Sequence, residues 1–83
     1  MATDEVPPGP DAESAAQRAA DHLALALEEV GFDVGVAFPE LHSRSERSGT
    51  ATVLLGSVSP VVAAGLASIL TDAARLGLAL PPR

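Results

Sequence analysis

The chain has 83 residues, a net charge of −6, 47% hydrophobic residues and no cysteine. A chain of this length forms one domain and buries only roughly 60% of its unfolded surface. The acidic balance disfavours binding to nucleic acids and to anionic membranes, both of which need a basic surface. The lack of cysteine excludes disulfides, thiolate catalysis and cysteine-based zinc sites. Only 2% of the residues are aromatic, so the core lacks large side chains and we expect a second subunit to complete it.

Residues 1–10 are acidic and rich in proline, and they predict a disordered tail. A single domain is expected over residues 11–80. The first residues lack the basic and then apolar pattern of a secretory signal, so the expected location is the cytoplasm. All the basic residues are arginine, and together with the abundant alanine this is typical of high-GC bacteria.

The next segment predicts an amphipathic helix from about Asp11 to Val30, closed by Gly31 in the left-handed conformation. Leu25 falls on the polar face of this helix and is therefore a candidate interface residue. The apolar residues share one face at 100° per residue. They are Ala12, Ala16, Ala19, Ala20, Leu23, Ala26, Leu27 and Val30.

Two strands are expected after this helix. Residues 32–38 alternate large apolar residues with small or polar ones, which predicts a half-buried strand that Pro39 ends. Residues 50–56 are rich in β-branched and aliphatic residues and predict the second strand. The polar segment 40–49 is then either a long hairpin connection or an extension of both strands with a tight turn near residues 45–48.

A second helix is expected from Pro60 to about Leu76, with Ser57 or Ser59 as its N-cap and Gly77 after its end. Its apolar residues cover about half of the circumference, which is more than one two-stranded sheet can bury. Residues 77–83 form either a short third strand or a tail. The interface candidates are Val62, Leu66, Ile69 and Leu70, together with Leu25 of the first helix.

The predicted fold class is α+β, a two-layer unit in the order helix, strand, strand, helix. Two strands are marginal as a sheet and leave open edges. We therefore expect a homodimer in which two hairpins form one four-stranded antiparallel sheet.

A membrane span is an alternative for part of this chain, because residues 49–70 carry no charge. Gly56 and Pro60 lie in the middle of the segment, where they would interrupt a helix in lipid. The same residues suit a turn from strand to helix. We therefore favour a strand and a helix here and expect no membrane partner.

The densest group of charged residues lies in the segment 40–49. Glu40, His42, Arg44 and Arg47 are the candidate contacts to a ligand or partner. No spacing in the chain is typical of a nucleophile with its base, of paired catalytic carboxylates or of a metal site. No catalytic residue, metal or cofactor is therefore predicted.

The sequence favours a small acidic protein-interaction module without catalytic activity. It would act as an accessory, adaptor or antitoxin-like regulatory subunit, in the form of a homodimer that docks on a larger protein partner. The alternative is a small-ligand or anion-binding protein, or a minimal enzyme, that uses the charged segment 40–49. A single-span membrane-associated peptide is the remaining alternative.

Overall fold

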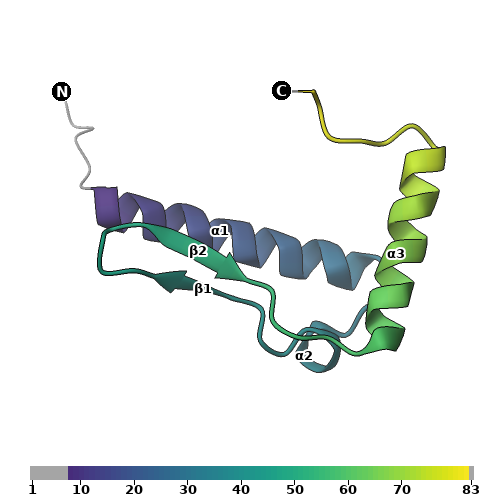
Figure 1. Ribbon diagram of the computed structural model, residues 1–83, viewed down its shortest axis with the longest axis horizontal. Coiled ribbons are helices and arrows are strands. Elements are labelled where there is room, and N and C mark those ends of the chain that lie inside the picture. Colours follow the sequence, from purple (N-terminus) through teal and green to yellow (C-terminus); the bar gives the residue numbers. More distant parts are fainter. Residues whose placement is uncertain (1–7, 83) are drawn as a thin grey trace.

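A computed structural model describes residues 8–82 of the chain, as a mixed α/β structure with three helices and one two-stranded sheet (Figure 1). The predicted combination of helices with an antiparallel hairpin is confirmed. Most of the predicted 1–10 tail lies outside the described residues. In chain order the elements are α1 (Pro8–Glu29), α2 (Val34–Ala37), β1 (His42–Ser45), β2 (Ala51–Leu54) and α3 (Pro60–Arg75).

Helix α1 begins three residues before the predicted start, because proline is tolerated in the first turn, where no backbone N–H is needed. It ends at Glu29, one residue before the predicted end, and Gly31 closes it as predicted. Gly31 has a φ of 113°, and its N–H donates to the carbonyl of Glu28 while the N–H of Phe32 donates to the carbonyl of Leu27, both at 3.0 Å. This pair of bonds is the Schellman motif, which satisfies the last carbonyls of a helix.

The predicted strand over residues 32–38 is wrong, since residues 34–37 form the single helical turn α2. The N–H of Ala37 donates to the carbonyl of Asp33 at 2.7 Å, and the N–H of Phe38 donates to the carbonyl of Val34 at 2.9 Å. In a strand, Phe32 and Phe38 would lie about 20 Å apart. The helical turn brings their rings to 5.4 Å in an edge-to-face contact, which this aromatic-poor chain uses as part of its core.

The first strand instead comes from the polar segment 40–49. The alternative of extended strands anticipated a tight turn in this segment, but it treated the strand here as a continuation of one at 32–38. Strands β1 and β2 pair antiparallel, with Ser43 opposite Val53 and Ser45 opposite Ala51. Residues 46–50 form the turn, in which the N–H of Glu46 donates to the carbonyl of Thr50 at 2.8 Å. A short turn costs less loop-closure entropy than the long connection that a strand at 32–38 would have required.

Helix α3 follows the prediction closely at both ends. The Ser59 hydroxyl accepts a hydrogen bond from the N–H of Val62 at 3.2 Å, and Pro60 occupies the first turn. At the other end, Gly77 has a φ of 85°, and the N–H of Leu78 donates to the carbonyl of Ala73 at 2.9 Å. Residues 77–82 contain no strand, so the third strand that the sequence left open does not form in the described chain.

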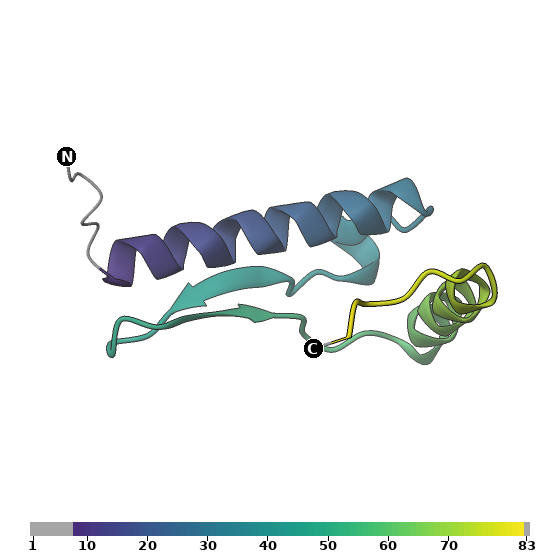
Figure 2. The same ribbon diagram turned by 90° about the horizontal axis from the view of Figure 1, so that it is seen from above.

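The core lies between α1 and the hairpin, which run side by side (Figures 1 and 2). Its buried residues among those described are Ala16, Ala20, Leu27 and Phe38. Helix α3 stands across the end of α1 instead of alongside it (Figure 2), and within residues 8–82 it packs closely against none of the other elements. The predicted two-layer unit is thus present for α1 and the hairpin, while α3 lies outside both layers.

Candidate functional site

The charged residues predicted as ligand contacts do not surround a common space. Glu40 precedes β1, and its carboxylate accepts a hydrogen bond from the N–H of Ser57 at 2.9 Å. His42 places Nδ1 2.6 Å from the carbonyl oxygen of Glu40. Arg44 lies with Nε 3.8 Å from Oε2 of Glu46, and Arg47 is exposed in the turn. Because Glu40 is occupied by the loop before α3, these residues are not gathered into one site.

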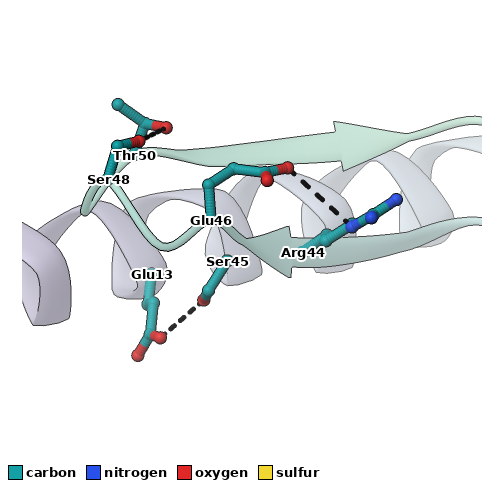
Figure 3. A network of polar contacts seen from close by, with 6 residues as sticks. All are labelled: Glu13, Arg44, Ser45, Glu46, Ser48 and Thr50. Atoms are coloured by element: carbon teal, nitrogen blue, oxygen red, sulfur yellow. Dashed lines mark hydrogen bonds and ion pairs between the residues drawn. The ribbon is translucent and has the colours of Figure 1, made fainter.

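Strand β1 directs its two kinds of polar side chain to opposite faces of the sheet. The Ser43 hydroxyl donates to Oε1 of Gln17 at 3.0 Å, and the Ser45 hydroxyl donates to Oε2 of Glu13 at 2.5 Å. Side chains alternate along a strand, so His42 and Arg44 lie on the face turned away from α1. Figure 3 shows Ser45 reaching Glu13 of α1, while Arg44 is joined to Glu46.

These polar contacts hold the hairpin on α1. A strand of the sequence HSRS offers no large apolar side chain to a helix, and hydroxyl donors to Gln17 and Glu13 replace that packing. The contacts are exposed, so each contributes modestly to stability. The exposed pair of Arg44 and Glu46 contributes less still.

Ionisable groups do not converge elsewhere in the described chain. Within residues 8–82 there is no cavity of ligand size and no cluster of three or more potential metal ligands. Among the described helices, none is long and apolar enough to cross a membrane. The apolar run 49–70 is divided between β2, a loop and α3.

The outstanding surface feature is a partly exposed apolar face of α3, which we call the α3 face and define as Ala63, Leu66, Leu70 and Ala73. No side chain of α3 is buried, and Leu70 is 60% exposed. The helix touches its own chain on another side, where a Cβ on Gly65 would lie 3.7 Å from the Phe32 ring. At 100° per residue, Leu70 lies about 140° around the helix from Gly65. Ala63 and Leu70 therefore point away from the chain's own core, whereas Leu66 and Ala73 are half-buried on the side of the helix nearer to Phe32.

The interface residues predicted from the sequence fall into two groups. Leu25 and Leu70 are more than half exposed, at 56% and 60%. Val62, Leu66 and Ile69 are half-buried, with no buried residue among them. Of the α3 residues predicted to form an interface, Leu66 and Leu70 thus belong to the α3 face.

A second apolar surface was not expected, and it lies on α1. The predicted apolar face of α1 is wider than the hairpin can cover, so only the line of Ala16, Ala20 and Leu27 is buried. A parallel line, about 70° around the helix at 100° per residue, stays exposed. We call this line the α1 stripe; it consists of Ala19, Leu23, Ala26 and Val30. The sequence did carry a signal for the α1 stripe, because the eight apolar residues on one face of the first helix form an arc wider than a two-stranded hairpin can cover.

Comparison of the chain with models of known protein families, with curated proteins and with solved structures found no match.

Proposed function

We propose that this protein is a small interaction module without catalytic activity of its own, and that it binds another polypeptide chain through the α3 face. The observation that carries the proposal is the position of α3, which packs closely against none of the other described elements and has no buried side chain. Most of the stability of a helix in a protein comes from the packing of its apolar face, and α3 has little such packing in its own chain. A partner that covers its apolar face would supply the missing stabilisation.

The distribution of charge supports the same surface. The chain has a net charge of −6, yet no charged residue occurs between Arg47 and Asp72. Within α3, Oδ1 of Asp72 lies 3.7 Å from Nη1 of Arg75, and the two charges cancel. Most of the α3 face therefore lies in the long uncharged part of this acidic protein, which another chain can approach with little charge to desolvate.

The role that fits such a module is that of an accessory, adaptor or antitoxin-like regulatory subunit in the cytoplasm. We include in the proposal that the module is a homodimer. The sequence predicts a dimer in which two hairpins pair at their edges into a four-stranded antiparallel sheet and so satisfy the open edges of β1 and β2. A dimer formed through the α3 face is the competing geometry, and the variants described below distinguish the two.

Site-specific photo-crosslinking tests the binding surface. A photoreactive amino acid is introduced at Leu70 of the full chain, in cells that produce the protein, and the matched control places it at Ser68. Ser68 is exposed on the same helix, about 160° around the axis from Leu70. We expect a covalent adduct with one polypeptide from position 70 and none from position 68. No adduct at position 70, or the same adducts from both positions, would contradict the proposal.

A further inference from the structure

We propose that the occupant of the α3 face is the α1 stripe of a second copy of this chain, in a reciprocal dimer. This inference rests on the proposed function, since it names the partner of the same surface. Each copy would give its α3 to the partner's α1 and receive the partner's α3 on its own α1. The contact would then occur twice, related by a two-fold axis.

The first argument is that the chain leaves two apolar surfaces largely exposed and that they are alike in the spacing of their residues. The α1 stripe recurs at intervals of four, three and four residues, and the α3 face at intervals of three, four and three. Both intervals keep side chains on one line of a helix, which is the pattern by which two helices pack side by side. A pairing of α3 with α3 would leave the α1 stripe in water, whereas the reciprocal contact covers both surfaces with one kind of partner.

Charge gives the second argument. Helix α1 carries five acidic residues and one arginine, a net charge of −4. Two copies of α1 would therefore repel each other if their stripes met. Helix α3 carries one aspartate and one arginine, which are paired. A contact between α1 and the partner's α3 places the acidic helix against a neutral one and avoids that repulsion.

The exposed area gives the third argument. The chain exposes 6252 Å², whereas a compact protein of 8.4 kDa exposes about 4,600 Å². The excess is about 1,600 Å². This excess is larger than the roughly 800 Å² that each partner buries in a standard interface.

The α3 face does not bind the α1 stripe of its own chain. Helix α3 stands across the end of α1 (Figure 1), and the loop that leads to it is attached to the start of the hairpin by the hydrogen bond from Ser57 to Glu40. This attachment directs α3 away from the stripe of its own α1 and leaves it free for a neighbour.

Light scattering of the full chain across micromolar concentrations tests the inference. We expect a mass of twice 8.4 kDa for the unmodified chain. Leu23→Asp and Leu70→Asp should each lower the mass to that of one chain. The matched controls are Ser14→Asp and Val61→Asp, which place the same charge on the same helices at exposed residues away from both surfaces. The controls should remain dimeric.

Mixing the two disruptive variants provides the decisive step. In a mixed dimer both lesions fall in the same contact, between α1 of the Leu23→Asp copy and α3 of the Leu70→Asp copy. The other contact is intact, so the mixture should regain a dimer that neither variant forms alone. Circular dichroism checks that each variant is folded, and Leu23→Ser and Leu70→Ser replace any that is not.

The other outcomes separate this inference from the proposed function. A mixture that stays monomeric would overturn the contact between α1 and α3. Dimers of both Leu23→Asp and Leu70→Asp would also overturn it, because such dimers must form through the strand edges or another surface. The unmodified chain could instead be monomeric and crosslink from position 70 to a different polypeptide. That result would show that the α3 face does not bind a second copy, and the proposed function would still hold. A monomer without any such adduct would overturn both.

Discussion

The side chain of Glu40 accepts a hydrogen bond from the backbone N–H of Ser57 at 2.9 Å. Glu40 comes shortly before β1 and Ser57 shortly after β2. Their bond therefore joins the two chain segments at the open end of the hairpin, where no further ladder bond holds them. It also sets the direction in which the chain enters α3.

Replacing Glu40 should separate the role of this hydrogen bond from that of the charge. Glu40→Ala removes the acceptor. Because a hydrogen bond contributes about 0.5–1.5 kcal/mol and this one is exposed, the variant should lower the free energy of unfolding by about 0.5–1 kcal/mol. Glu40→Gln keeps an oxygen acceptor and should retain most of the stability. Urea denaturation of both variants measures the difference. Equal stability of the alanine variant and the unmodified chain would show that the bond contributes nothing.

Gly56 should tolerate no side chain, for two independent reasons. Its φ of 78° is unfavourable for other residues, and a Cβ at this position would clash with the side chain of Glu40. Gly77 is the matched control, since it has a φ of 85° with open space around it. Both alanine variants should lose more than about 0.5–1 kcal/mol through backbone strain, and Gly56→Ala should lose more than Gly77→Ala. Their thermal midpoints provide the comparison, and a smaller loss at Gly56 would contradict the clash.

Phe38 should be the most sensitive core position. It is 7% exposed and packs edge-to-face with Phe32. Phe→Ala changes in cores cost about 3–5 kcal/mol, which equals the whole stability expected of so small a domain. We therefore expect Phe38→Ala to unfold the chain and Phe38→Leu to lower its thermal midpoint. Val36→Ala, at an exposed position of the same helical turn, should change stability by less than about 0.5 kcal/mol. A folded Phe38→Ala variant with an unchanged midpoint would argue against this core.

Ser59 should stabilise α3 specifically. Ser59→Ala removes the hydroxyl that accepts from the N–H of Val62, and loss of such a cap costs about 1 kcal/mol. Ser68→Ala is the control, because Ser68 is exposed within the helix and alanine is the better helix former. Amide hydrogen exchange should show faster exchange in α3 for Ser59→Ala alone, with little change in α1. Uniform loss of protection across the chain would mean instead that α3 unfolds together with the rest.

Much of the candidate surface could be anticipated from the sequence, and the part that could not has a clear cause. Leu66 and Leu70 were predicted as interface residues because α3 carries more apolar surface than a hairpin can bury. The α1 stripe was missed, because Leu23 and Val30 share an apolar face with Leu27 and nothing in the pattern says how far the hairpin reaches around the helix. Coverage depends on sheet width, which is a property of the assembled layers.

The sequence alone determined the features that depend on residues close together in the chain. Gly31 and Gly77 end their helices, and Ser59 with Pro60 begins α3, because caps and left-handed glycines act within a few residues. The tertiary structure decided which segment pairs with β2. From their local sequence, residues 32–38 and residues 42–45 are equally compatible with a strand. Only the latter is close enough for a short turn, and only its serines can bond to Glu13 and Gln17 of α1. A strand is stable only with its partners, so partners distant in sequence decide where it forms.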